Sequence, residues 1–471
     1  MNPQDNRWRG WVALACAGWL VLTSGCATYK DQASTMSTAW ASGNYAAAAR
    51  DFSSRARKQS NGKDAVIWNL EAGAALRAIG DYTNSNRHFD IAAAAIDRYE
   101  QAAKVRVGQE ALATFSNQQN LPYEGRPYDK IMLHTYKALN FLAVGDVDRA
   151  RPEVIRMYQR QQDAVAENRR RIEQAQAAER ASKDPEAIAR TKADPTFNQA
   201  VNGLSQNLVG FRAYADYVNP FSVYLDGLYF LHAGGGASDL ERAIKSLNRV
   251  IEVAGENRFV AADVRAASDL LRGQRPPPLT YVIFENGRGA SRDQVRIDIP
   301  IIFADVSYVG AAFPKLVFHE GQLPAITVTA DGVQETTQTV SSMDAVIAQD
   351  FKNELPAIVT RTVIATLAKG AAAYAANRAA WQQSGELGML VRIATAVAQM
   401  AVNIADTRSW TTLPKEFQVA RINTPASRQL TVAAPGGQSL NVALIDGVVN
   451  VVYVKSVSAG TPLLVSQFKL R

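Results

Sequence analysis

Three consecutive prolines, Pro276 to Pro278, separate two parts of the chain that have different hydrophobic patterns. Before them apolar residues recur at helical spacing, and after them apolar and polar residues alternate as they do in strands. Proline lacks the backbone N–H that a helix needs, and its ring clashes with the preceding turn, so no helix continues through this stretch. The sequence therefore predicts an α+β multidomain protein, with an all-α domain at residues 26–272 and a β-rich domain at residues 279–471.

One spacing pattern recurs within the predicted helical domain. It begins at four positions, which are Gly43, Gly80, Gly145 and, more weakly, Ser238. After the first of these, Tyr45, Ala48 and Phe52 follow at two, five and nine residues, and the last two share one stripe of a helix. This arrangement resembles the tetratricopeptide repeat (TPR), whose helix pairs stack because one pair cannot bury its apolar face alone. We therefore predict a TPR-like helical repeat array.

A long charged helix is predicted at about residues 148–190, between the third and fourth copies of the pattern. Helix-forming and charged residues dominate this stretch, and apolar residues are sparse. Its basic run, Asn168 to Arg171, suggests an alternative role in contacting an anionic partner or lipid headgroups. Acidic residues alternate with the basic ones, which favours an ordinary solvated helix face.

Strand patterns begin with the run LTYVIFE at Leu279 and continue to the end of the chain. Gly436-Gly437 interrupts the last alternating run and predicts a hairpin turn, and Asp446-Gly447 predicts a second turn. Two alanine-rich stretches lie among the strands, at about residues 342–380 and 386–407. We predict that they form a helical hairpin, inserted at about residues 342–407.

The N-terminus has the features of a lipoprotein signal peptide at residues 1–25. Two arginines precede an apolar run, Gly10 to Leu22, which is shorter than the ~20 residues of a membrane span. The sequence LTSGC then resembles the lipobox of bacterial lipoproteins, in which the cysteine is lipidated and the chain is cut before it. We therefore expect a mature chain that begins at lipidated Cys26. The alternative is an ordinary signal peptide with an incidental free cysteine.

Two further observations bear on location and partners. The other cysteine, Cys16, would leave with the signal peptide, so the mature chain has no disulfide of its own. Ala27, not aspartate, follows Cys26, and the lipoprotein resemblance then implies the outer membrane of a Gram-negative bacterium, with the protein facing the periplasm. The formal charge of +7 becomes +6 without the signal peptide, and the basic residues are dispersed, so no nucleic-acid partner is expected.

Known motifs for catalysis and cofactor binding do not occur in the sequence. HEGQL at His319 lacks the second histidine of H-E-x-x-H, because Leu323 takes its place, and no phosphate-binding loop or nucleophile elbow is present. The other histidines, His88, His134 and His232, fall in separate predicted helices, where packing or surface roles are favoured. We predict no catalytic residue, metal or cofactor, although folding can bring distant carboxylates together into an acid–base pair.

An aromatic segment at residues 211–231 contains the residues that we expect to bind a partner. Pro220 suits the first turn of a helix there. The candidate residues are Tyr217, Asn219, Tyr224 and Tyr229. Tyrosines combine an apolar ring with a hydroxyl and are frequent in protein-binding grooves. Packing in a helical core is the alternative interpretation of this segment.

Several sequence blocks resemble a family of uncharacterised bacterial TPR-like periplasmic lipoproteins. They are YDKIMLHTYKALNFLAVGDVDRAR, YVNPFSVYLDGLYF, YVIFENG, AAFPKL and ADTRSWTTLPKEFQVAR. The resemblance covers most of the mature chain and implies neither an activity nor catalytic residues, and such proteins are associated with envelope lipoproteins. The loop after the ENG block departs from the family pattern. In the last block, we expect Asp406 and Arg408 to pair locally while Trp410 packs.

Two functions from different classes are consistent with these features. The first is an outer-membrane-anchored periplasmic lipoprotein that acts as a non-enzymatic protein–protein interaction scaffold in cell-envelope assembly or cell-wall synthesis, with an envelope protein as partner. The alternative is an envelope glycan-binding protein or glycan-acting enzyme that uses the C-terminal β-rich domain. A cavity with convergent carboxylates would favour the alternative, and a solvent-open aromatic face on the helices would favour the scaffold.

Overall fold

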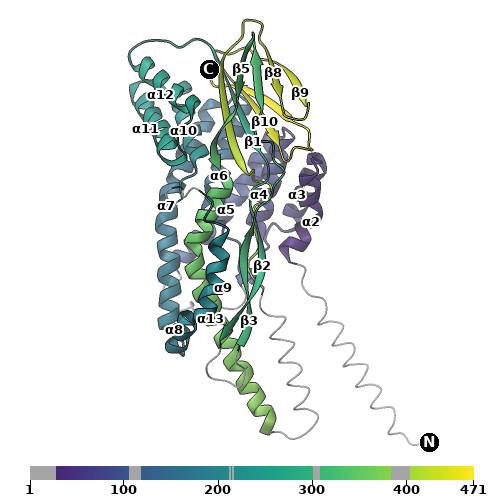
Figure 1. Ribbon diagram of the computed structural model, residues 1–471, viewed down its shortest axis with the longest axis vertical. Coiled ribbons are helices and arrows are strands. Elements are labelled where there is room, and N and C mark those ends of the chain that lie inside the picture. The colour runs from purple at the N-terminus through teal and green to yellow at the C-terminus, as the bar shows by residue number, and fades with distance from the viewer. Residues whose placement is uncertain (1–27, 106–117, 212–213, 215–216, 301–307, 383–403) are drawn as a thin grey trace, which may run out of the picture.

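The computed structural model describes residues 28–105, 118–211, 214, 217–300, 308–382 and 404–471. An N-terminal helical region is followed by a β-rich region with one long helix, so the predicted α+β multidomain class is confirmed (Figure 1). The body is elongated, and several helices run along its long axis. None of the helices described has both the length and the apolar character that crossing a membrane requires.

Helices α2 to α12 make up the helical region. Their bounds are α2 (Tyr29–Ala41), α3 (Tyr45–Lys58), α4 (Ala65–Ala78), α5 (Tyr82–Val105), α6 (Pro127–Ala143), α7 (Val147–Arg180), α8 (Pro185–Ala193), α9 (Pro195–Gln206), α10 (Pro220–His232), α11 (Ala237–Ala254) and α12 (Arg258–Leu271), with a short 3-10 helix, η2 (Gln118–Asn120), before α6. Neighbours in the sequence pack as the pairs α2/α3, α4/α5, α6/α7 and α10/α11.

Glycine turns join three of these helix pairs. Gly43, Gly80 and Gly145 have φ angles of 80°, 80° and 77°, a left-handed conformation that glycine adopts readily because it has no Cβ. In α3, which follows the first turn, Ala48 and Phe52 of the predicted stripe are fully buried. The repeated sequence pattern thus corresponds to helix–turn–helix units, and the region is consistent with helical repeats.

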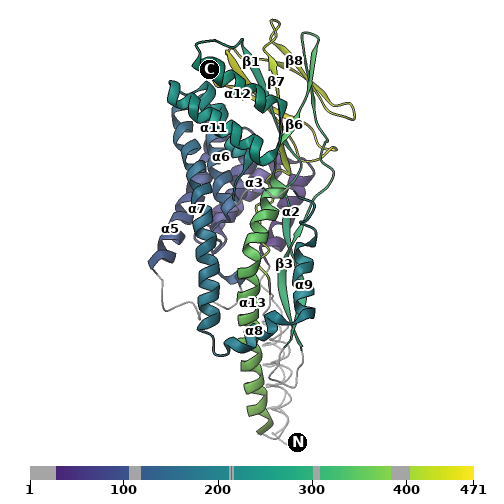
Figure 2. The same cartoon turned by 60° about the vertical axis from the view of Figure 1, so that its left-hand side comes forward.

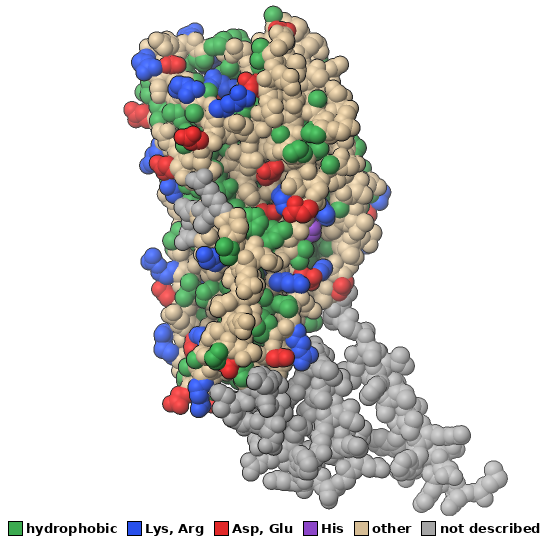
Figure 3. All heavy atoms as spheres, in the orientation of Figure 1, with side chains coloured by type: hydrophobic (Ala, Val, Ile, Leu, Met, Phe, Trp, Pro, Cys, Tyr) green, Lys and Arg blue, Asp and Glu red, His purple; other side chains and the backbone are tan. Residues whose placement is uncertain are grey.

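The predicted long charged helix is α7, which ends at Arg180, before the expected end at about residue 190. The chain turns there, and Asp184 caps the next helix, α8, whose first residue is Pro185. One side of α7 is buried through residues such as Val154 and Met157, while the rest of its surface is exposed. Lys and Arg side chains are interspersed with Asp and Glu on the face in Figure 3, as the dispersed charges of the sequence predict.

Eleven strands are described in the C-terminal region. They are β1 (Leu279–Asn286), β2 (Ser291–Pro300), β3 (Tyr308–Val317), β4 (Thr327–Ala330), β5 (Val333–Thr336), β6 (Gln338–Ser342), β7 (Glu416–Asn423), β8 (Gln429–Ala433), β9 (Ser439–Ala443), β10 (Val449–Ser456) and β11 (Leu464–Lys469). The main sheet has the order β11-β10-β1-β7-β6, with β1 parallel to β10. A second sheet has the order β5-β4-β8-β9, and its β8–β9 hairpin turns at Gly436-Gly437 as predicted.

One long helix, α13 (Met343–Gln382), corresponds to the first arm of the predicted helical hairpin. The second arm, at about residues 386–407, falls mostly on residues 383–403, which lie outside the described part of the chain. The description resumes at Ile404 without regular secondary structure. Helix α13 packs against α7, α8 and the β2–β3 ribbon, and Figure 2 shows these elements side by side.

The main hydrophobic core runs across the junction between the helical and β-rich regions. It includes side chains from α2 through to β11. Phe221 of α10 stacks on Phe417 of β7, with ring centroids 3.7 Å apart. The Tyr281 hydroxyl of β1 donates to Asp263 of α12 at 2.7 Å. Residues 272–278 therefore separate helix from strand in the sequence, while the packed interior is continuous.

Candidate functional site

The four residues expected to bind a partner are buried within the chain. Asn219 caps α10, and its Oδ1 accepts from the amides of Phe221 and Ser222 at 3.1 and 3.3 Å. The Tyr224 hydroxyl donates to Asp263 at 3.2 Å, and the Tyr229 hydroxyl donates to a backbone carbonyl of α7 at 3.0 Å.

Burial decides between the two interpretations of the aromatic segment. Asn219 and Tyr224 are 0% exposed, Tyr229 is 2% exposed and Tyr217 is 7% exposed. Side chains enclosed in this way present no surface to a partner, so the core interpretation describes them, and the expected partner site does not lie here. The remaining predicted residue, Cys26, lies outside the described residues.

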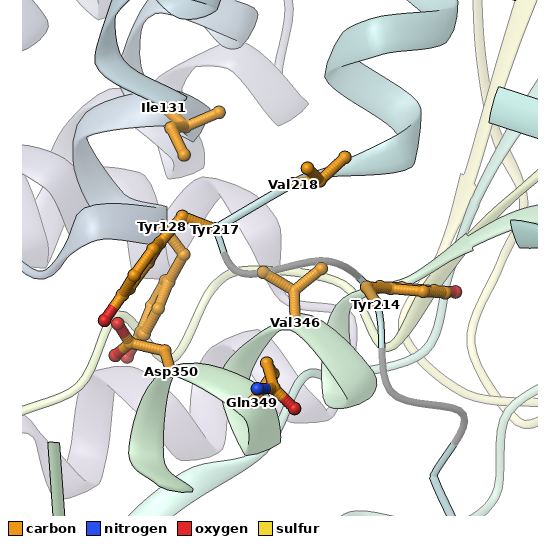
Figure 4. Close-up of a pocket in the computed structure, with 8 residues that line it drawn as sticks. All are labelled: Tyr128, Ile131, Tyr214, Tyr217, Val218, Val346, Gln349 and Asp350. Atoms are coloured by element: carbon orange, nitrogen blue, oxygen red, sulfur yellow. The ribbon is translucent and has the colours of Figure 1, made fainter. Parts of the chain in front are cut away.

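Tyr217 also lines a very small cavity beside α13. Figure 4 shows Tyr128, Tyr217 and Asp350 around this space, whose volume is about 10 Å³. That volume holds about one water molecule. The backbone of Tyr217 has a φ of 61°, an uncommon conformation for a residue with a side chain. The cavity is too small for an organic substrate.

A buried ion-pair cluster lies next to this cavity. Arg126 and Arg292 both donate to Oε2 of Glu354, at 2.6 and 2.8 Å, and Arg292 lies 3.9 Å from Asp350. Burial, assisted by Glu354, raises the pKa of Asp350 to about 7. Burial opposes ionisation of Glu354 too, but Arg126 and Arg292 outweigh it and lower the pKa of that carboxyl. Asp350 therefore holds a proton more readily than Glu354, as the acid of an acid–base pair does. The adjacent cavity, however, is too small to admit a substrate.

Residues 404–414, here called the docked segment, have no regular secondary structure and lie against helices α2, α4, α5 and α6. Glu71 of α4 holds this segment. Its carboxylate accepts from the backbone amides and hydroxyls of Thr411 and Thr412, at 2.6 to 3.1 Å, and from the Tyr29 hydroxyl of α2 at 3.0 Å. Burial raises the pKa of Glu71, while these hydrogen bonds favour its ionised form.

Arg408 and Trp410 anchor the docked segment further. Arg408 donates to Asp406 at 2.8 Å, which confirms the expected local pair, and also to Asp64 at the start of α4 at 2.9 Å. Trp410 is 1% exposed, and its ring lies 5.9 Å from that of Phe89 and 5.8 Å from that of Tyr136. Neither Glu71 nor Asp64 was predicted from the sequence to hold this segment. A carboxylate within the apolar run AVIWNLEAGAAL signals a buried partner, although it does not identify that partner.

A larger cavity of about 290 Å³ lies between the array and the main sheet. It is lined by Ala74, Arg77, Ala78, Ile79, Gly80, Tyr82, Tyr136, Glu285, Tyr453, Lys455, Leu464, Val465 and Ser466. Strand register positions its floor, because Glu285 of β1 pairs with Lys455 of β10, and Lys455 pairs with Leu464 of β11. Its volume is near the lower end of the ~300–1,000 Å³ of typical ligand pockets.

Glu285 is the only carboxylate among these described lining residues. It pairs with the ammonium of Lys455 and accepts from the hydroxyls of Tyr136 and Tyr453, at 2.9 and 2.6 Å. Burial opposes its charge, but Lys455 and Arg77 outweigh burial and lower the pKa of Glu285. Glu285 is therefore a fixed anion in the cavity floor, without the second carboxylate that general acid–base hydrolysis of a glycan commonly uses.

The three histidines for which a packing or surface role was favoured are all buried and have hydrogen-bond partners. His88 contacts Asn69 at 2.7 Å, His134 contacts Glu153 at 2.6 Å, and His232 contacts the Tyr281 hydroxyl at 2.8 Å. Burial lowers the pKa of His88 to about 4 and that of His232 to about 3. Across the described ranges, no group of three or more His, Cys, Asp or Glu side chains is arranged to hold a metal ion.

Comparison with protein-family models, with curated proteins and with solved structures finds no match to this chain.

Proposed function

We propose that the protein is an outer-membrane-anchored periplasmic lipoprotein that acts as a non-enzymatic scaffold for protein–protein interactions in cell-envelope assembly or cell-wall synthesis. The observation that supports this most is the docked segment. Helices α2, α4, α5 and α6 together hold an irregular stretch of chain through Glu71, Asp64 and an aromatic pocket for Trp410. TPR-like arrays use stacked helices as extended binding surfaces, and this array already binds a segment of its own chain.

The occupied array restricts where a partner binds. The helix faces that contact the docked segment are covered, so an envelope protein uses an outer surface instead. On α7, Tyr158 and Val165 are 37% and 44% exposed and are seven residues apart, which is two helical turns. They are two exposed apolar side chains on the same side of α7.

The lipid anchor follows from the LTSGC block, and the fold adds a consequence. Helix α2 begins at Tyr29, three residues after Cys26, and three residues span at most ~11 Å. A lipid on Cys26 therefore holds the array close to the membrane surface, where envelope proteins are within reach.

A glycan-acting enzyme draws less support from the geometry. The larger cavity has one carboxylate among its described lining residues, and that carboxylate is engaged by Lys455 and two tyrosines.

Lipidation is tested with a Cys26→Ala variant. We expect incorporation of a fatty-acid analogue to be lost and the protein to leave the outer-membrane fraction. Cys16→Ala is the matched control, because that residue lies within the signal peptide, and its labelling should be unchanged. Full labelling of Cys26→Ala would exclude the lipoprotein assignment.

The scaffold function is tested by photo-crosslinking in cells. A photoreactive amino acid at Tyr158 or Val165 should give a discrete adduct with an envelope protein, and mass spectrometry then identifies it. Val333 on β5, which is 53% exposed, is the control position in the β-rich region. Adducts from Val333 alone would move the partner surface to the second sheet, and no adduct from any position would argue against a scaffold.

A further inference from the structure

The larger cavity contains a buried arginine that forms no direct ion pair in the described residues. Arg77 is 8% exposed and donates to Oδ1 of Asn140 at 2.9 Å. Within the described part of the chain it forms no ion pair, whereas Lys455 beside it is paired with Glu285. The charged lining residues are Arg77, Lys455 and Glu285, so together they carry one net positive charge.

The guanidinium of Arg77 is held in place by aromatic rings and an amide. It lies 4.6 Å from the ring centroid of Tyr453, 5.4 Å from that of Tyr136 and 5.9 Å from that of Tyr82. Asn140, which accepts its hydrogen bond, is itself fixed by donating to Ser85 and Asn86, at 2.8 and 2.9 Å. These contacts position the cation without neutralising its charge.

Part of the cavity lining, at the end of α4, is exposed to solvent. Ile79 on its rim is 46% exposed, and a side chain added at the adjacent Gly80 would meet no atom within 4 Å. Tyr82 on the same rim is half-buried, whereas Tyr136 and Glu285 in the floor are 1% and 2% exposed. The charged floor is therefore buried beneath an open rim, as in a ligand pocket.

We propose that this cavity binds a small organic carboxylate, about the size of one sugar unit or a dipeptide, whose carboxylate pairs with Arg77. Arg77 and Lys455 share a single buried carboxylate, Glu285, so one positive charge stays uncompensated, and a ligand carboxylate would compensate it. Guanidinium groups bind carboxylates through two parallel hydrogen bonds, which gives the pair a fixed geometry. Ala74, Ala78 and Leu464 provide an apolar wall for the rest of the ligand, and Tyr82 and Ser466 provide hydroxyls.

This inference goes beyond the scaffold function and does not depend on it, since the cavity does not include the outer face of α7. Isothermal titration of the full chain in detergent micelles tests it with two matched pairs of probes. The first pair is N-acetylmuramic acid and N-acetylglucosamine, which lacks the carboxylate. The second is D-alanyl-D-alanine and its C-terminal amide. Binding confined to one pair distinguishes an acidic sugar from a peptide terminus.

We expect at least one carboxylate probe to bind with a dissociation constant below ~1 mM and at least ~10-fold more tightly than its neutral counterpart. Arg77→Gln should abolish that preference. Ser466→Phe should block binding while leaving every charge in place, because Ser466 pairs with Tyr453 and lies on the cavity side of β11. Arg57→Gln, on the exposed surface of α3, should bind like the unmodified protein.

Three results would overturn the proposal. They are no binding by either carboxylate, equal binding of charged and neutral probes, and undiminished binding by Ser466→Phe. The last variant keeps the test valid if Arg77→Gln fails to fold. Crosslinking through α7 is read out separately, so failure here leaves the scaffold function unaffected.

Discussion

Arg408 and Arg77 are both buried, yet their electrostatic surroundings differ. Arg408 is 1% exposed and pairs with Asp406 and Asp64, so that its own segment and the array both supply carboxylates. Arg77 is 8% exposed and has aromatic rings and an amide around it, with no ion pair in the described residues. Carboxylates of the chain itself therefore neutralise Arg408, whereas Arg77 is available to pair with an anion.

This difference separates structural charges from charges that are available for binding. A buried ion pair is costly to break, because removing one partner leaves the other desolvated and unpaired. A buried cation with no ionic partner has no such pair to lose. Substitution at the two arginines should therefore have unequal effects on stability.

Arg408→Met should have the largest effect. It leaves Asp406 and Asp64 without their cation, so we expect the free energy of unfolding to fall by ~3–5 kcal/mol in a urea titration followed by circular dichroism. Arg272→Met is the control, because that side chain is 64% exposed, and its effect should be within ~0.5 kcal/mol. Equal effects of the two substitutions would mean that the docked segment is not held by its ion pairs.

Tyr224→Ala and Tyr229→Ala should each destabilise the protein by ~3 kcal/mol or more, because a large ring is removed from the core. Tyr158→Ala on the exposed face of α7 is the matched control and should cost less than ~1 kcal/mol. If either variant kept normal stability but lost the photo-crosslinked adduct, the aromatic segment would instead bind the partner. Differential scanning fluorimetry and urea titration both distinguish these outcomes.

Asp350 should make stability depend on pH. Its pKa is raised in the folded protein, from 3.8 to about 7, so the folded state binds the proton more tightly than the unfolded state. Its contribution is therefore fully present below about pH 4 and is lost as the pH rises toward 7, by at most ~1.4 kcal/mol per pH unit.

The Asp350→Asn variant cannot ionise at this position. Its free energy of unfolding, measured at pH values from 4 to 7, should decline less steeply than that of the unmodified protein. Asp298→Asn is the control, because the Asp298 side chain is 64% exposed. This variant should keep the slope of the unmodified protein. An unchanged slope in Asp350→Asn would show that Asp350 is not the titrating group.

Arg77→Met should have the smallest effect, a loss of ~1–2 kcal/mol, because it removes a hydrogen bond to Asn140 and contacts with aromatic rings but breaks no direct ion pair. The same urea titration used for Arg408→Met measures it. A loss as large as that of Arg408→Met would break the comparison, since Arg77 would then be a structural charge like Arg408.

Features that depend on neighbouring residues were predictable from the sequence. The prolines at residues 276–278 separate helix from strand, and Gly43 and Gly80 form turns because their local conformation favours glycine. The pair of Asp406 and Arg408 is equally local, since the two residues are two positions apart in the chain. The α+β class followed from the change in hydrophobic period, which reflects the geometry of helices and strands themselves.

The candidate sites could not be predicted, because they depend on contacts between distant segments. Glu71 binds Thr411 and Thr412, which lie 340 and 341 residues away, and the cavity combines α4, α5 and α6 with β1, β10 and β11. Tyr224 has the residue type and spacing of a partner-binding side chain, but it is enclosed by α12 and the sheet. Periodicity determines which face of an element is apolar, whereas only tertiary packing decides which element covers that face and which buried charge is left without a partner.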